Sequence, residues 1–171
     1  MAIRRSAGVL LFRGRGADVE VLLAHMGGPF WARKDAGAWS LPKGEHGPEE
    51  QPQAAARREF EEELGAPPPH GEWTPLGETR QSGGKVVTVW AVEGDFDPHQ
   101  IVPGTFAMEW PKGSGRLREF PEVDRVTWFP LEAAAPRLVA AQRVFLDRLA
   151  AHLAGPRAGQ PDGDTAAGGP T

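Results

Sequence analysis

With 171 residues, 40% of them hydrophobic and 25% charged, the chain is long enough for one domain with a buried core. The net charge of −4 gives no general attraction to nucleic acid or an anionic membrane, and no apolar run is long enough to span a bilayer. The absence of cysteine excludes disulfides, thiolate metal sites and a cysteine nucleophile. We therefore expect a cytoplasmic protein whose partner is neither a nucleic acid nor a membrane.

Two β-leaning apolar segments open the chain, at residues 6–12 and 19–25. The glycines and the aspartate between them are typical of a turn, which predicts a hairpin-like connection. Residues 21–24 are apolar without interruption. Such a run favours a strand that is covered on both faces.

A loop follows at residues 26–38, and it contains Phe30, Trp31, Arg33 and Lys34. Aromatic side chains beside cations can stack on a base and hold a phosphate, which makes Trp31 and Arg33 candidate substrate-binding residues. The same aromatic side chains can instead pin the loop onto the domain. The exposure of Trp31 distinguishes the two interpretations.

The most informative stretch is 44–66, which becomes helical from Pro52 and stops at Gly65. Helical spacing places Glu59, Glu62 and Glu63 on one face. Like charges at this spacing cost roughly 0.2–0.5 kcal/mol per pair, and acids near a helix C-terminus oppose its dipole. Either this is a solvated acidic face, or a bound divalent cation offsets the repulsion.

The same helix carries an apolar line at Ala56, Phe60 and Leu64, spaced by four residues. This line predicts that the helix packs on a sheet. Because the acidic face lies beside the buried one, we expect the carboxylates at the edge of a cleft.

Alternation and turn residues predict the remaining elements, and mixed strands with two main helices imply an α/β domain with helices on both sheet faces. Residues 155–171 hold almost no large apolar residue, so we expect a domain at 1–154 and a disordered tail at 155–171. The expected strands are 75–79, 85–93, 105–111 and 126–129, with a flexible basic loop at 112–116. The expected helices are 131–135, broken by Pro136, and 142–153.

Residues 44–66 resemble the Nudix box, Gly-x5-Glu-x7-Arg-Glu-U-x-Glu-Glu-x-Gly-U, in which U is a bulky aliphatic residue. Both U positions depart, with Phe60 and Ala66, and these are packing positions. The Pro-Lys-Gly form at 42–44 looks like the branch that acts on dinucleoside polyphosphates or diphosphoinositol polyphosphates. All seven fixed positions of the box match: Gly44, Glu50, Arg58, Glu59, Glu62, Glu63 and Gly65.

The resemblance implies the Nudix α/β/α sandwich with a central mixed sheet. It implies hydrolysis of a phosphoanhydride in a nucleoside diphosphate linked to another moiety X, with Mg²⁺ as cofactor and Mn²⁺ as a substitute. Glu59, Glu62 and Glu63 would be metal ligands and catalytic residues. Arg58 and Glu50 would form a supporting pair. Gly44 and Gly65 would serve backbone geometry. The competing interpretation is a Nudix-fold module that senses a nucleotide without cleaving it.

Members of this family often carry a further acid outside the box, before a Trp/Phe strand that is followed by Leu-Glu. Residues 128–132 fit that ending, and Glu122 is the candidate acid, with Glu119 as the alternative. The general base would be Glu122 or one of the three box acids. Lys43 is either a phosphate contact or an ordinary loop lysine.

Overall fold

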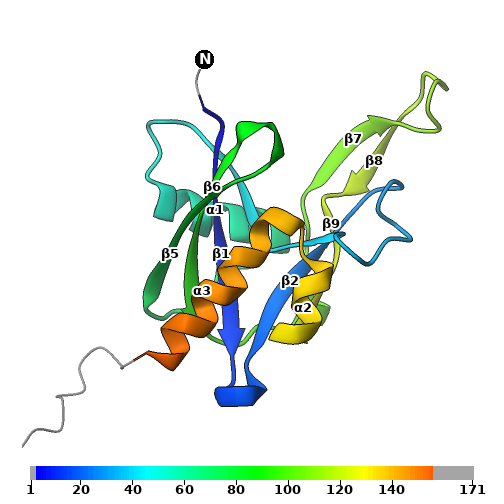
Figure 1. Cartoon of the computed structure of the whole chain (residues 1–171). Coiled ribbons are helices and arrows are strands. Elements are labelled where there is room, and N and C mark those ends of the chain that lie inside the picture. Colours follow the sequence, from blue (N-terminus) through cyan, green and yellow to red (C-terminus); the bar gives the residue numbers. More distant parts are fainter. Residues whose placement is uncertain (1–2, 156–171) are drawn as a thin grey trace, which may run out of the picture.

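The computed structural model describes residues 3–155, so the expected tail lies outside the described residues apart from Gly155. Within this range no helix is long and apolar enough to cross a membrane. Figure 1 shows strands β1, β2, β5, β6, β7, β8 and β9 with helices α1, α2 and α3. The strands and helices are β1 Arg5–Arg13, β2 Glu20–Met26, β3 Trp39–Ser40, β4 Lys43–His46, α1 Pro52–Leu64, β5 Trp73–Arg80, β6 Val86–Glu93, β7 Thr105–Glu109, β8 Leu117–Pro121, β9 Val123–Pro130, α2 Leu131–Arg137 and α3 Arg143–Ala154.

Seven strands form a central mixed sheet in the order β3-β2-β1-β6-β5, to which β4 adds on β1 and β9 on β2. Strand β1 pairs in parallel with β6 and antiparallel with β2 and β4. The antiparallel β1–β2 pair confirms the hairpin-like connection that the turn residues predicted. Because β4 lies on β1, the loop before α1 is anchored to the middle of the sheet.

Each face of the sheet is covered by helices, and β2 shows why. Val21 and Leu23 point into the core beneath α2 and α3, whereas Leu22 and Ala24 point into the core beneath α1. The continuous apolar run therefore does mark a strand buried on both faces. The expected α/β/α sandwich is confirmed, with α1 on one side of the sheet and α2 and α3 on the other (Figure 1).

Several local predictions were incomplete. The short strands β3, β4 and β8 were not predicted. Pro136 does not break the helix after β9, because it lies in the last turn of α2, where its missing N–H removes one hydrogen bond only. Leu153, one of the apolar residues of the predicted helix 142–153, is 39% exposed.

Strands β7 and β8 form a separate two-stranded sheet that projects from the domain (Figure 1). Residues 27–37, called here the aromatic loop, lie next to this hairpin. A Cβ added to Gly28 would meet the ring of Phe106 in β7 at 2.8 Å, so the two projections are in contact at their bases. They extend the molecule beyond the sandwich on one side.

Candidate active site

Helix α1 presents the acidic residues, and its ends are fixed by local chemistry. Pro52 occupies the first turn, where no N–H is needed, and Gly65 ends the helix in the left-handed conformation at φ 82°. The Gly65 N–H donates to the carbonyl of Glu61 at 2.7 Å. Phe60 and Leu64 are fully buried against the sheet, which turns the neighbouring acids toward the segment that precedes α1.

The carboxylate of Glu59 lies against the backbone of Gly44. A Cβ added to Gly44 would overlap that carboxylate, so only glycine leaves room for it. Burial raises the pKa of Glu59, and the charges of Glu62 and Glu122 add to the rise, whereas the Arg58 guanidinium opposes it. Gly44 thus contributes space as well as backbone geometry.

Glu63 is half-buried beside Lys43. Its carboxylate accepts a hydrogen bond from the backbone N–H of Lys43 at 3.3 Å. Burial raises the pKa of Glu63 to about 8, with additional repulsion from Glu122 and Glu59 and partial relief from the Lys43 ammonium. Glu59, Glu63 and Glu122, which come from two distant parts of the chain, are therefore near enough for their charges to repel one another.

Glu122 reaches this place because a chain of backbone hydrogen bonds links it to α1. The Gly104 N–H donates to the carbonyl of Glu62 at 3.1 Å, and the Glu122 N–H donates to the carbonyl of Gly104 at 2.8 Å. On the other side, the Gly27 N–H donates to the carbonyl of Glu122 at 2.9 Å. Glu119, the alternative acid, lies farther along the hairpin opposite Ala107.

Arg58 connects the box residues. Its Nε and Nη2 each donate to Glu50 at 2.8 Å, and its Nη1 donates to Glu59 at 2.8 Å and to Glu62 at 3.1 Å. These hydrogen bonds, that with Glu50 foremost, raise the pKa of Arg58 above its ordinary value. Glu62 is 57% exposed on this side, so it is held by Arg58 rather than by burial. Arg58 and Glu50 thus form an ion pair, and their predicted role in supporting the acids stays a prediction.

Two lysines flank the acids, and only one was expected. Burial lowers the pKa of Lys43, and the nearby charge of Lys85 lowers it further. Lys85 precedes β6 and pairs with Glu45 at 3.4 Å. Sequence reasoning missed Lys85, because its only signal is its place at the start of the predicted strand 85–93.

Trp31 and Arg33 lie on the aromatic loop, away from the box helix. Trp31 is half-buried and packs on the core, so it pins the loop, whereas its neighbour Phe30 is 62% exposed. Arg33 is exposed. Their predicted contact with substrate stays a prediction.

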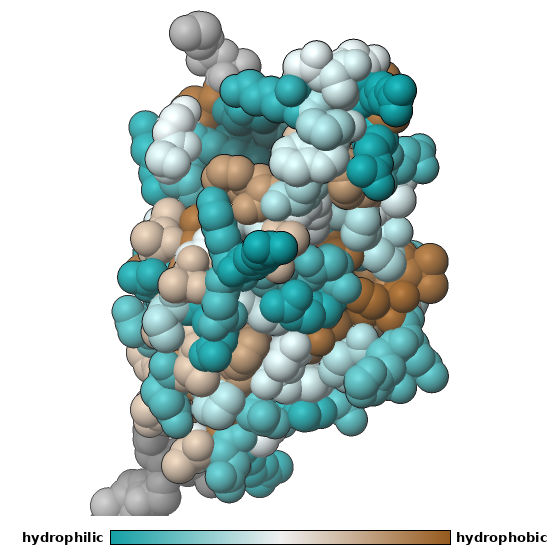
Figure 2. Space-filling view, turned by 90° about the vertical axis from the view of Figure 1, so that its right-hand side faces the viewer, coloured by the Kyte–Doolittle hydropathy of each residue, from teal (hydrophilic) through white to brown (hydrophobic). Residues whose placement is uncertain are grey.

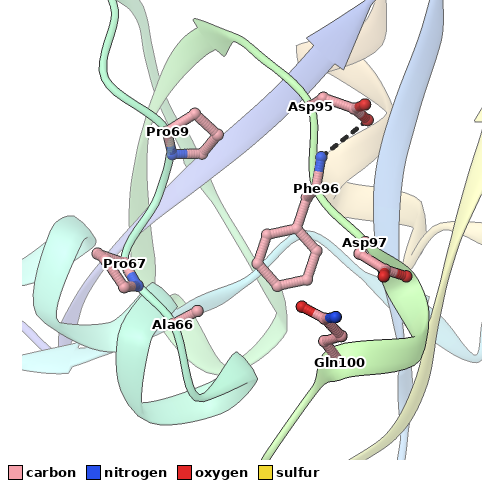
Figure 3. Close-up of a pocket in the computed structure, with 7 residues that line it drawn as sticks. All are labelled: Ala66, Pro67, Pro69, Asp95, Phe96, Asp97 and Gln100. Atoms are coloured by element: carbon pink, nitrogen blue, oxygen red, sulfur yellow. Dashed lines mark hydrogen bonds between the residues drawn. The ribbon is translucent and has the colours of Figure 1, made fainter.

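A hollow of about 320 Å³ lies away from the acids. It lies beyond the C-terminal end of α1, where the Phe96 ring faces the prolines that follow the helix (Figure 3). Since it contains none of the predicted site residues, the acids and not this hollow define the candidate site. It is lined by Ala66, Pro67, Pro69, Asp95, Phe96, Asp97 and Gln100.

Comparison with known proteins identifies the arrangement. The NUDIX domain model matches residues 2–149. The chain belongs to the NUDIX family. No protein of curated function matches it. The expectation of a Nudix pyrophosphohydrolase, made from the box, agrees with this assignment.

Solved structures of other NUDIX proteins share the fold. An Ap4A hydrolase of C. elegans is 22% identical with a TM-score of 0.59, covering 89% of this chain and 98% of its own. The NUDIX domain of Shewanella oneidensis NrtR, solved with ADP ribose, is 18% identical with a TM-score of 0.59 and 90% coverage of both chains. A MutT protein from Methanosarcina mazei is 22% identical with a TM-score of 0.54, covering 87% and 94%.

NUDIX enzymes generally use divalent metal ions, and the acids here fit such an ion. Among residues 3–155 no three acidic or histidine side chains already converge as a preformed metal site. The donor set is nevertheless suited to a hard cation, because Glu59, Glu63 and Glu122 are oxygen ligands whose mutual repulsion a cation would relieve. The Arg58 guanidinium supplies positive charge to Glu59 and Glu62 in this structure.

Proposed function

We propose that the protein hydrolyses a phosphoanhydride bond in a nucleoside diphosphate linked to another moiety X, with Mg²⁺ as cofactor and Mn²⁺ as a substitute. The observation that carries the proposal is that Glu122, linked to α1 through Gly104, is near enough for its charge to raise the pKa values of the half-buried Glu59 and Glu63. A chain without cysteine is compatible with the reducing cytoplasm, where we expect the protein to act. Dinucleoside polyphosphates are a candidate class, since the Pro-Lys-Gly form precedes the box and an Ap4A hydrolase shares the fold.

In this mechanism Glu59, Glu62, Glu63 and Glu122 would hold the cation and the attacking water. Bound Mg²⁺ would supply polarisation of the phosphoryl oxygens and a lower pKa for water. Glu63, whose pKa burial raises to about 8, would suit a proton acceptor near neutral pH.

The flanking cations would position the substrate. Lys43 and Lys85 carry like charges close together, and a phosphate chain beside them would relieve their repulsion. Arg58, aimed by Glu50, would hold the acids in place. Positioning and charge neutralisation account for most of the rate in phosphoryl transfer.

The test is a Mg²⁺-dependent hydrolysis screen of wild type beside Glu62→Gln, with products separated by chromatography. The substrates are dinucleoside polyphosphates, ADP-ribose, oxidised nucleoside triphosphates, capped RNA and diphosphoinositol polyphosphates. We expect cleavage of one class that Glu62→Gln largely abolishes while it folds normally. A mutant with unchanged kcat at saturating Mg²⁺ would remove Glu62 from the mechanism. Cleavage of none with either metal would favour the nucleotide-sensing module.

A further inference from the structure

The aromatic loop is held in one conformation from beneath. His25 is fully buried, with Nδ1 2.8 Å from a carboxylate oxygen of Asp124 in β9 and Nε2 2.7 Å from the carbonyl oxygen of Lys34. The side chain of Asp35 accepts a hydrogen bond from the Trp39 indole at 2.8 Å. The loop is therefore organised before any ligand arrives, which lowers the entropic cost of binding.

This loop presents an aromatic ring to solvent. Phe30 packs edge-to-face on Trp31 with ring centroids 4.8 Å apart, and Trp31 rests on the core. The ammonium of Lys34 lies 3.3 Å from the centroid of the Phe30 ring. An exposed phenylalanine with a support at its edge and a cation over one face of its ring is suited to stack its opposite face on a second, anionic aromatic group.

The β7–β8 hairpin, which lies next to the loop, also carries aromatic rings beside a cation. Phe106 and Phe120 are directly opposite each other in β7 and β8, with centroids 6.1 Å apart, and Phe106 lies over Gly28. Arg118, two positions from Phe120, points to the same face and lies 5.7 Å from its ring. We call this the inner face of the hairpin; Leu117 lies on the opposite face.

Both projections begin at the acids. Gly27 at the start of the loop bonds to Glu122 at the base of the hairpin, and Phe30 follows only three residues later. Three extended residues span at most about 11 Å, so Phe30 lies within one nucleotide's reach of the acids. Figure 2 shows the side of the molecule from which the two projections extend in Figure 1. This surface is mainly hydrophilic, is hollowed near its upper end, and has hydrophobic side chains gathered at one edge.

We propose that the aromatic loop and the inner face of the hairpin bind the base of a nucleotide substrate. Phe30 stacks on the base, while Lys34 and Arg118 offset the charge of its phosphates. The inference rests on the proposed function, since the phosphate chain has to end at the acids. A base fits better than an inositol polyphosphate, because the saturated inositol ring has no aromatic face to stack on Phe30 and would need a cation in its place.

Direct binding tests this subsite without turnover. Calorimetry with Mg²⁺ would compare a non-hydrolysable, methylene-bridged analogue of diadenosine tetraphosphate with inorganic tripolyphosphate, which has no base. We expect Phe30→Ala to weaken binding of the analogue roughly tenfold, as loss of one base stack does, and to leave tripolyphosphate unchanged. Phe30→Trp should restore binding. Leu117→Ala, a matched control at 76% exposure, should change neither ligand.

Other outcomes would overturn the subsite. One is that Phe30→Ala weakens the binding of both ligands equally, and another is that it weakens the binding of neither. A third is that the wild-type protein binds tripolyphosphate but not the analogue. The proposed function fails separately: analogue binding that depends on Phe30 without hydrolysis of any substrate would leave the subsite and remove catalysis. Intact hydrolysis together with analogue binding that is unchanged in Phe30→Ala would remove the subsite and leave the proposed catalysis.

Discussion

Gly44 and the carboxylate of Glu59 occupy adjoining space, so that no side chain fits at position 44 while Glu59 stays where it is. Gly44→Ala should therefore displace the carboxylate and lower kcat, on the order of 10²-fold for a shift near 1 Å, with little loss of fold. Steady-state hydrolysis and circular dichroism would measure both. Gly47→Ala in the same loop is the control, because its Cβ would meet nothing within 4 Å. Equal effects of the two changes would contradict the role of Gly44.

Metal binding should stabilise the folded protein. Mg²⁺ would relieve the repulsion among Glu59, Glu63 and Glu122, and a ligand at 100 times its Kd adds about 2.7 kcal/mol to the free energy of unfolding. A thermal melt with Mg²⁺ or with EDTA measures the shift in Tm. Glu63→Gln should reduce it and Glu61→Gln, an exposed acid on the same helix, should not. A wild-type Tm that is indifferent to Mg²⁺ would contradict the metal site.

In EDTA, stability should depend on pH through Glu63. The folded state raises the pKa of this carboxyl to about 8, above the ordinary value of 4.5, so the folded state binds the proton more tightly than the unfolded state. Stability is then greatest below pH 4.5 as far as this group is concerned, and falls as the pH rises toward 8. Urea denaturation across this range should show a shallower decline for Glu63→Gln. Parallel curves for the two proteins would count against the raised pKa.

The bidentate contact of Arg58 with Glu50 should be specific for arginine. Arg58→Lys keeps the charge but loses one of the two parallel hydrogen bonds, so the acids it aims are less well placed. We expect Mg²⁺ affinity or kcat to fall roughly 10–100-fold, the usual range for residues that support a metal ligand. Arg57→Lys is the control, since Arg57 lies over the Trp73 ring. Wild-type affinity and kcat in Arg58→Lys would refute the supporting role.

Removing the imidazole beneath the aromatic loop should loosen it. His25→Ala leaves Asp124 and the Lys34 carbonyl without their partner, at a cost of about 1–3 kcal/mol in the free energy of unfolding. Urea denaturation gives this value, and the nucleotide analogue should also bind more weakly. Asp124→Asn, which keeps an acceptor, should cost less. Stability equal to that of wild type in His25→Ala would mean that the contact does not hold the loop.

The helix with the acids could be predicted almost to the residue, because Pro52 and Gly65 mark its ends and Phe60 marks its buried face. The strand β4 could not, since Lys43–His46 is short and lacks apolar alternation, and it is a strand only because it pairs with β1. Likewise, the approach of Lys85 to Lys43 depends on how β4 and β6 flank β1.

The chain of backbone hydrogen bonds through Gly104, Glu122 and Gly27 separates two tasks in the molecule. The outer part of the hairpin lies beyond this clamp, so its length and sequence can vary without moving Glu122 relative to α1. Hairpins of different length could be exchanged on this scaffold, and such chimaeras should differ in which nucleotide they prefer while retaining the same metal requirement. In the proposed mechanism the hairpin is thus a replaceable recognition module attached to a fixed reaction centre.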